Sequence, residues 1–160
     1  MIVILIAGAG ILLLIGKGVE TVVAPSIKSN QFDEDFKAAA RDYGLDWMML
    51  KAIAANESSL GRAASVARGM QNPNDVEGSK SSDGKSWGLM QVTLTTARDW
   101  DTSATPQKLN DPKYSIRLAA QYLAWLYLRF PSIDARLIEW VVKSYNQGPG
   151  NTANERAGKI

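Results

Sequence analysis

The segment that most constrains the fold is residues 45–59, with the sequence LDWMMLKAIAANESS. Asp46 is one of the residue types that commonly cap the first turn of a helix. After it, apolar side chains recur at helical spacing and form a single stripe. The stripe consists of Met49, Leu50, Ile53 and Ala54. We predict a helix that begins after Asp46 and buries this stripe.

Glu57 lies on the same stripe, four residues after Ile53 and seven after Leu50. A charged carboxylate on a buried face is costly, and the last turn of a helix adds the negative end of the helix dipole. Both effects predict a raised pKa, so that Glu57 stays protonated near neutral pH, as a general acid requires. The alternatives are a frayed helix end that exposes Glu57 to water, or an ion pair with a buried arginine.

Helical patterns continue on both sides of this segment, and no convincing run of alternating strand residues is present. Residues 33–43 place apolar side chains on one face, and Gly44 supplies a C-terminal stop. Residues 61–86 are rich in Gly, Ser, Asn and Asp, and we predict that they form a long irregular loop.

Two further helices are predicted in the C-terminal half. The pair Asp111-Pro112 is a typical helix start, and Pro131 ends that helix. The next helix begins at Ser132 or Asp134, continues to Tyr145 and stops at residues 147–150. The predicted fold class is therefore mainly α.

Residues 2–15 form an uninterrupted run of apolar or small residues, IVILIAGAGILLLI. As a helix this run is about 21 Å long, short of the roughly 30 Å hydrocarbon core of a membrane, and an extension to Ala24 makes it long enough. We predict one N-terminal transmembrane helix, a signal-anchor-like membrane anchor at residues 1–24, followed by a linker at 25–31. A cleaved signal peptide and a buried core helix are the alternatives. Residues 32–152 then form the folded domain, and 153–160 a polar tail.

Composition excludes several kinds of chemistry. The 160 residues include no cysteine and no histidine, which removes disulfides, thiolate nucleophiles, Ser-His-Asp triads and His-ligated zinc sites. Carboxylate, lysine and tyrosine remain for general acid–base catalysis. The net charge is only +2 and no long basic block is present, so nucleic acid is not an expected partner.

Three short motifs surround Glu57 in sequence order. They are Asn56-Glu57-Ser58-Ser59, Gly88-Leu89-Met90-Gln91-Val92 and Ser144-Tyr145-Asn146-Gln147-Gly148-Pro149-Gly150. With them the chain resembles the soluble lytic transglycosylase (SLT) family, whose lysozyme-like domain carries E-S, G-L-M-Q and A-Y-N-x-G signatures in this order. The resemblance covers roughly residues 32–152 and includes Leu109-Asn110-Asp111-Pro112. It implies a lysozyme-like transglycosylase domain.

The resemblance also implies a role for each matching residue. Glu57 is similar to the family's single catalytic acid/base, and Ser58 to the serine that supports it. Gln91 resembles the glutamine that faces the sugar subsites. Tyr145 is similar to the tyrosine whose hydroxyl lies near the catalytic carboxyl, and Asn146 is expected to brace that turn. Two differences from the family are the spacing of Glu57 and Gln91, in which Gln91 follows 34 positions after Glu57 and an insertion within residues 61–86 is implied, and Ser144 in place of alanine.

The implied reaction cuts the bond between N-acetylmuramic acid and N-acetylglucosamine in peptidoglycan glycan strands. It forms a 1,6-anhydro product and needs no metal or cofactor. Trp87 and Trp100 are candidates for stacking on sugar rings. The implied location is a membrane-anchored domain on the cell-wall, periplasmic side, or in a phage virion membrane. A phage-encoded role in entry or lysis is one hypothesis, and bacterial wall remodelling or a secretion apparatus are others.

Two other functions remain open at this point. A hydrolytic lysozyme, resembling goose-type enzymes, needs a second carboxylate to position water. The candidates for it are Asp75, Glu77, Asp83, Asp99 and Asp101. A non-catalytic, membrane-anchored protein that binds the wall or assists assembly is the other alternative, and the presence of Glu57, Gln91 and Tyr145 argues against it.

Overall fold

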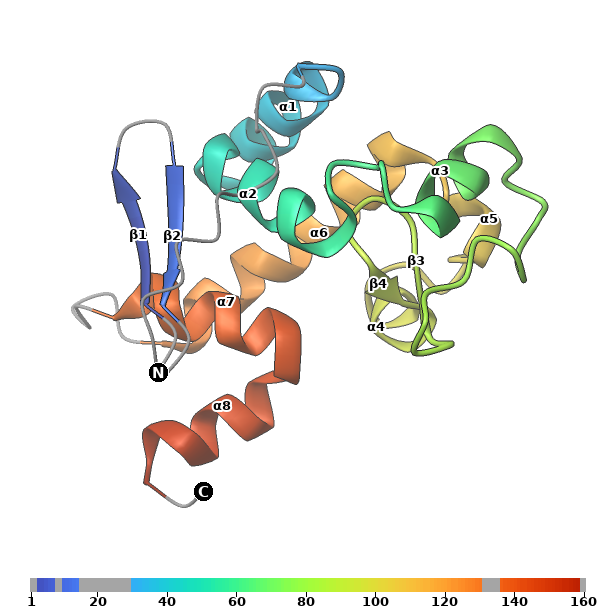
Figure 1. Cartoon of the computed structure of the whole chain (residues 1–160). Helices are drawn as coiled ribbons and strands as arrows, with labels where there is room; N and C mark the ends of the chain where they lie inside the picture. The colour runs from blue at the N-terminus through green and yellow to red at the C-terminus, as the bar shows by residue number, and fades with distance from the viewer. Residues whose placement is uncertain (1–2, 8–9, 15–29, 131–135, 159–160) are drawn as a thin grey trace. The chain divides into compact units, whose positions relative to one another are not determined.

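A computed structural model describes residues 3–7, 10–14, 30–130 and 136–158. The chain divides into two compact units. One unit comprises residues 24–121, and the other combines residues 1–23 with 122–160. Most of the described residues are helical (Figure 1), so the predicted mainly α fold class is confirmed.

The unit of residues 24–121 contains five complete helices, the first part of a sixth and a small β-hairpin. The elements are α1 (Asp33–Tyr43), α2 (Trp47–Ser58), α3 (Ala64–Gln71), β3 (Ser86–Trp87), β4 (Val92–Thr93), α4 (Leu94–Trp100), α5 (Pro106–Leu109) and the start of α6 (Pro112–Arg129). α6 continues into the other unit, because the boundary between the units follows Gln121.

Helix α2 forms as the sequence predicts. The Asp46 side chain accepts a hydrogen bond from the Met48 backbone N–H at 2.8 Å, and such a cap contributes about 1 kcal/mol. All four residues of the predicted stripe are buried, and Leu50 is fully buried. Each large apolar side chain buried in this way contributes roughly 1.5–3 kcal/mol. The helix therefore owes its place to a conventional amphipathic pattern.

A short turn and a buried ion pair hold α1 against α2. Gly44 ends α1 in the left-handed conformation with φ 67°, which confirms the predicted stop. The Lys51 ammonium lies 2.7 Å from the Asp33 carboxylate, and only 5% of the lysine side chain is exposed. Because Asp33 opens α1 and Lys51 lies in the middle of α2, this ion pair sets the register between the two helices.

The predicted loop at residues 61–86 contains a helix, α3, so that part of the loop prediction is wrong. The reason is that α3 has only eight residues and buries only Val66 and Gly69. Two buried positions cannot produce a recognisable period in the sequence. The remainder of the segment is irregular and hydrogen-bonded, as described below.

The other unit contains the end of α6, helices α7 (Leu137–Gln147) and α8 (Pro149–Arg156), and strands β1 (Val3–Ala7) and β2 (Gly10–Leu14). Helix α7 ends before Gly148, as predicted, and the predicted start at Ser132 or Asp134 lies outside the described residues. Helix α8 runs across the predicted domain end at residue 152. The buried residues of this unit include Leu123, Leu126, Phe130, Trp140, Val141 and Thr152.

The prediction of an N-terminal transmembrane helix is not confirmed. Residues 3–7 and 10–14, predicted as part of a transmembrane helix at 1–24, are two antiparallel strands that pair Val3 with Leu14 and Ala7 with Gly10. Aliphatic runs of five residues rich in Val, Ile and Leu favour strands, and periodicity alone does not separate such a run from a buried helix. Among the helices of the described part of the chain, none is long and apolar enough to cross a membrane. The rest of residues 1–24, and linker residues 25–29, lie outside the described residues.

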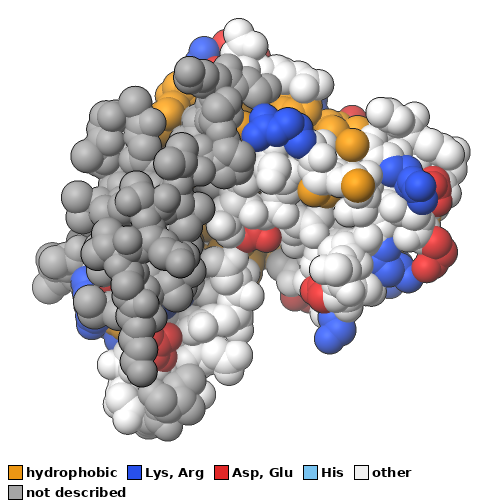
Figure 2. Space-filling model, in the orientation of Figure 1, with side chains coloured by type: hydrophobic (Ala, Val, Ile, Leu, Met, Phe, Trp, Pro, Cys, Tyr) orange, Lys and Arg blue, Asp and Glu red, His pale blue; other side chains and the backbone are white. Residues whose placement is uncertain are grey.

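The charged side chains of the described surface are mixed in sign. On the face drawn in Figure 2, Lys and Arg side chains lie among Asp and Glu side chains rather than forming one continuous basic area. This distribution agrees with the net charge of +2.

Candidate active site

Glu57 lies in the last turn of α2 and is half-buried. Burial raises the pKa of its carboxyl, and a 3.5 Å hydrogen bond from the Asn56 side-chain amide to Oε1 opposes that rise in part. The direction agrees with the sequence-based prediction. No lysine or arginine of the described residues lies within ion-pair distance of Glu57, so the alternative of a buried arginine partner finds no support in this part of the chain. Burial without a cation favours the neutral acid.

The chain reverses sharply just after Glu57. Ser59 and Leu60 both have positive φ, 53° and 55°, and their N–H groups donate to Ala55 and Ala54. A non-glycine residue in the left-handed region costs roughly 1–2 kcal/mol. The side chain of Leu60 is almost fully buried, and that burial offsets the cost. The reversal ends α2 one residue after Glu57, so the Glu57 carboxyl lies at the C-terminal end of the helix.

Ser58 ties this helix terminus to a turn 31 residues further along the chain. Its hydroxyl lies 2.7 Å from the Leu89 carbonyl oxygen and 3.1 Å from that of Ala54, and it accepts the Gly61 N–H at 3.1 Å. A serine hydroxyl has one hydrogen, so the two carbonyls share it, and the shorter distance favours Leu89. Since Ser58 is 1% exposed, water cannot replace these partners.

The turn that Ser58 holds is Gly88–Gln91, the loop of the β3–β4 hairpin. Trp87 pairs with Val92, and the Gln91 N–H donates to the Gly88 carbonyl at 3.1 Å. Leu89 and Met90 are fully buried, as expected of core side chains. Gln91 is half-buried with φ 49°, and its side-chain amide donates to the Gly88 carbonyl at 3.0 Å. The hairpin thus places Gln91 on a turn that is anchored to the helix end of Glu57.

Only glycine fits at position 88. Its φ is 75°, and a Cβ built there would lie 1.8 Å from the Leu109 carbonyl oxygen. The turn is also fixed from the other side, because the Met90 N–H donates to the Ser115 hydroxyl at 3.2 Å. Close backbone approach and a buried hydroxyl together leave this turn one position relative to the start of α6.

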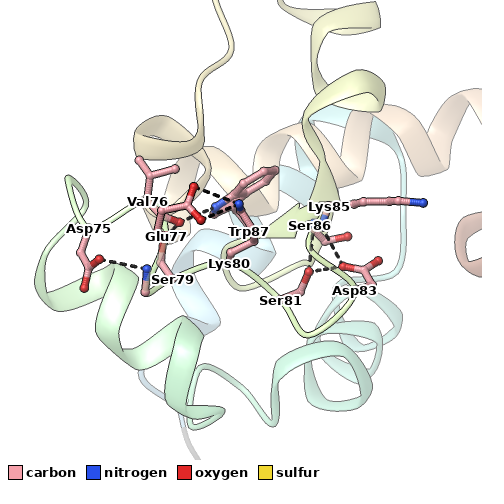
Figure 3. Close-up of polar contacts among 11 residues, drawn as sticks. Asp75, Val76, Glu77, Ser79, Lys80, Ser81, Asp83, Lys85, Ser86 and Trp87 are labelled. Atoms are coloured by element: carbon pink, nitrogen blue, oxygen red, sulfur yellow. Dashed lines mark hydrogen bonds and ion pairs between the residues drawn. The ribbon is translucent and has the colours of Figure 1, made fainter.

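The segment between α3 and β3 is a dense set of local hydrogen bonds (Figure 3). The Trp87 indole N–H donates to the Val76 carbonyl at 3.1 Å, and the Lys80 ammonium lies 5.9 Å from the Trp87 ring centroid and 2.7 Å from Glu77. Trp87 is 7% exposed, so it is a buried aromatic side chain rather than an open face for sugar stacking. The buried ring supports the segment between α3 and β3.

Asn110 fastens the insertion from the other side. It is 1% exposed, and its side-chain amide donates to the Pro73 carbonyl at 3.2 Å and to the Ser79 hydroxyl at 2.9 Å. The sequence patterns did not single out Asn110 or Ser115 as supports. For Ser115 the available signal was a small polar residue four positions before the buried Ala119, on the same helix face.

Tyr145 and Asn146 lie in the last turn of α7, in the other unit. Tyr145 is half-buried, and its ring centroid lies 5.8 Å from that of Tyr122 on α6, with a 42° angle between the planes. Asn146 is exposed. One unit therefore contains Glu57, Ser58 and Gln91, and the other contains Tyr145 and Asn146.

Comparison with known proteins identifies the family. The sequence matches the family described as "Transglycosylase SLT domain" over residues 34–159, which is most of the chain. The chain belongs to this family, which confirms the resemblance seen in the three motifs.

Three relatives are each named membrane-bound lytic murein transglycosylase F. The protein of Alteromonas mediterranea is 32% identical over 131 residues, 79% of this chain and 23% of the relative. That of Alcanivorax borkumensis is 31% identical over 127 residues, 78% and 23%, and that of Cellvibrio japonicus is 30% identical over 129 residues, 79% and 22%. The chain thus spans less than a quarter of the length of these relatives. No solved structure matches it.

Proposed function

We propose that this chain cleaves peptidoglycan glycan strands as a lytic transglycosylase, with Glu57 as its only acid/base. The observation that carries the proposal is the half-buried Glu57 with a raised pKa, whose neighbour Ser58 binds the turn that bears Gln91. Family membership and the names of the relatives support the same assignment.

In the proposed reaction, neutral Glu57 gives its proton to the glycosidic oxygen between N-acetylmuramic acid and N-acetylglucosamine. The bond from the anomeric carbon to that oxygen breaks, and the acetamido group of the muramic acid stabilises the positive charge that develops. Glu57, now ionised, takes the proton from the 6-hydroxyl of the same sugar, whose oxygen closes a 1,6-anhydro ring. The acid is regenerated, and no water is consumed.

The other site residues have proposed roles around this acid. Ser58 fixes the end of α2 against the Gly88–Gln91 turn, so that the acid and Gln91 keep a constant relation. Gln91 faces the sugar subsites and contacts the glycan bound there. The Tyr145 hydroxyl acts on the catalytic carboxyl, and Asn146 braces the turn that follows α7.

Hydrolysis by a second carboxylate is the competing chemistry, and among the described residues all the candidate acids on the loop side except Asp99 have other contacts. Asp75 lies 3.8 Å from Arg68. The Asp83 carboxylate accepts the Lys85 N–H and the Ser81 hydroxyl, which holds the pKa of Asp83 below its usual value. The acids Glu77 and Asp101 are engaged by Lys80 and by Ser103 and Tyr114. These engagements leave Asp99 as the remaining candidate for positioning water, and they favour the single-carboxylate reaction.

Mass spectrometry of the muropeptides released by the full chain tests this proposal. We expect products lighter by one water than reducing ends, and a loss of about a hundredfold or more in rate for Glu57→Gln. Glu34→Gln is the matched control, because the Glu34 side chain is 85% exposed on α1. Reducing ends would assign hydrolysis instead, and equal rates for wild type and Glu57→Gln would remove Glu57 from catalysis.

We also propose that the apolar N-terminal residues attach the protein to a membrane, with the catalytic domain on the wall side or in a phage virion membrane. The apolar run at residues 2–15 and the membrane-bound relatives support attachment. In a vesicle flotation assay the full chain should rise with the lipid, and a chain lacking residues 2–15 should stay in the soluble fraction. Flotation of both chains would place the membrane contact elsewhere.

A further inference from the structure

Three side chains on the end of α6 share one helix face. They are Tyr122, Trp125 and Arg129, at positions i, i+3 and i+7. The Tyr122 and Trp125 ring centroids lie 5.9 Å apart with 23° between the planes, and the Arg129 guanidinium carbon lies 4.0 Å from the Trp125 centroid. Tyr122 in turn contacts Tyr145 of α7. The four side chains form a column that begins at an exposed cation and ends at the candidate site tyrosine.

The geometry of the column indicates support rather than sugar binding. A sugar ring stacks on an open aromatic face, whereas here Trp125 has a nearly parallel Tyr122 ring beside it and a guanidinium above it. Offset-stacked rings and a cation over a ring are attractive arrangements that depend on orientation. Rotation of any one ring would disrupt its neighbours, so the column restricts the orientation of Tyr145.

We propose that Trp125 and Arg129 are positioning residues for the reaction, acting through Tyr122 on the Tyr145 ring. The inference rests on the proposed function and extends it to two residues that lie outside the three family motifs. The column keeps the Tyr145 hydroxyl in the orientation that catalysis uses, and it contributes little to substrate affinity. Its effect therefore falls on kcat rather than on KM. A small displacement of a catalytic group lowers the rate of the chemical step but leaves the contacts that bind substrate unchanged.

A double-mutant cycle on the full chain tests this, with muropeptide release as the assay. We expect Trp125→Ala to lower kcat about tenfold with KM within about twofold, and Trp125→Phe to restore most of the rate. Tyr145→Phe keeps the ring in the column but removes the hydroxyl. In the Tyr145→Phe background, Trp125→Ala should therefore have almost no further effect on kcat.

Two more variants keep the result interpretable if Trp125→Ala folds poorly. Arg129→Gln removes only an exposed cation, and we expect kcat to fall about twofold to threefold with no change in the melting temperature. Leu128→Ala is the control, because Leu128 is 87% exposed on the same turn of α6 and should behave as wild type.

The outcomes separate the two proposals. Unchanged kcat in both Trp125→Ala and Arg129→Gln, or effects of Trp125→Ala and Tyr145→Phe that multiply in full, would overturn the column. Wild-type kcat for Tyr145→Phe beside an inactive Glu57→Gln would also overturn it, together with the proposed role of the Tyr145 hydroxyl, while cleavage with Glu57 as the acid stands. An active Glu57→Gln would overturn the proposed function itself.

Discussion

The Ser58 hydroxyl donates to the Leu89 carbonyl oxygen at 2.7 Å, and this contact joins the residue after Glu57 to the turn that ends in Gln91. The two residues lie 31 positions apart and both are buried. The contact thus keeps the helix end of Glu57 and the Gly88–Gln91 turn together across the segment that separates them in sequence.

Ser58→Ala should destabilise the protein by about 1–3 kcal/mol, because the Leu89 carbonyl and the Gly61 N–H lose a buried partner. The Gly88–Gln91 turn should also loosen, with a fall in kcat of about tenfold. Thermal unfolding and muropeptide release measure the two effects. Ser82→Ala, on an exposed loop position, should leave both unchanged. An unaltered Ser58→Ala would mean that the hydroxyl does not fix the turn.

Gly88→Ala should prevent stable folding, at a cost of about 3 kcal/mol or more, since the new Cβ meets the Leu109 carbonyl oxygen at 1.8 Å. Gly84→Ala is a matched control for backbone conformation. Gly84 has a similar φ of 71°, but its Cβ would meet only the flexible end of Lys80 at 3.9 Å, so its cost should be about 1 kcal/mol. Urea unfolding measures both free energies. Equal costs would show that φ strain, not the close approach, dominates at position 88.

The raised pKa of Glu57 predicts two pH effects. As a general acid Glu57 must be protonated, so kcat/KM should fall as pH rises through its folded pKa, which lies above the usual value of 4.5. For stability, a carboxyl with a raised folded pKa binds its proton more tightly in the folded than in the unfolded state. Its contribution is therefore largest below the unfolded pKa and is lost as pH rises through the folded pKa.

Glu57→Gln removes the free-energy cost of burying an ionisable carboxyl at neutral pH. The variant should therefore have a higher melting temperature than wild type at pH 7 and nearly the same melting temperature at pH 4. Differential scanning calorimetry at the two pH values checks this. A constant difference between variant and wild type across that range would contradict a raised pKa.

Trp87→Phe should increase the mobility of the segment between α3 and β3 while keeping an apolar ring in place. The substitution removes the indole N–H that binds the Val76 carbonyl, at a cost of about 1 kcal/mol. Trypsin should then cut faster after Lys80 and Lys85, which lie in this segment. Trp100→Phe is the control, because it changes the same residue type outside the insertion. Unchanged cleavage rates would mean that the indole N–H does not hold the segment and that its other contacts, including those of Asn110, are sufficient.

Local sequence information was sufficient for α2 and for the chemistry of its end. The Asp46 cap, the buried stripe and the Gly44 stop all depend on contacts within a few residues, so their patterns are legible in a single chain. The direction of the Glu57 pKa shift follows from the same pattern, because the period of a helix decides which side chains are buried. The Asp111-Pro112 start of α6 is similarly local.

Other features depended on contacts between distant residues. No periodic pattern in the sequence indicates the Ser58–Leu89 hydrogen bond, the Trp87–Val76 hydrogen bond or the two hydrogen bonds that the Asn110 side-chain amide donates. Helix α3 and the strands β1 and β2 were missed for a related reason: short apolar segments take the structure that their neighbours allow. The sequence alone thus determined that Glu57 is the candidate acid, whereas the tertiary structure decided which turn its helix end is bonded to, because hydrogen bonds across the chain form only after the core has packed.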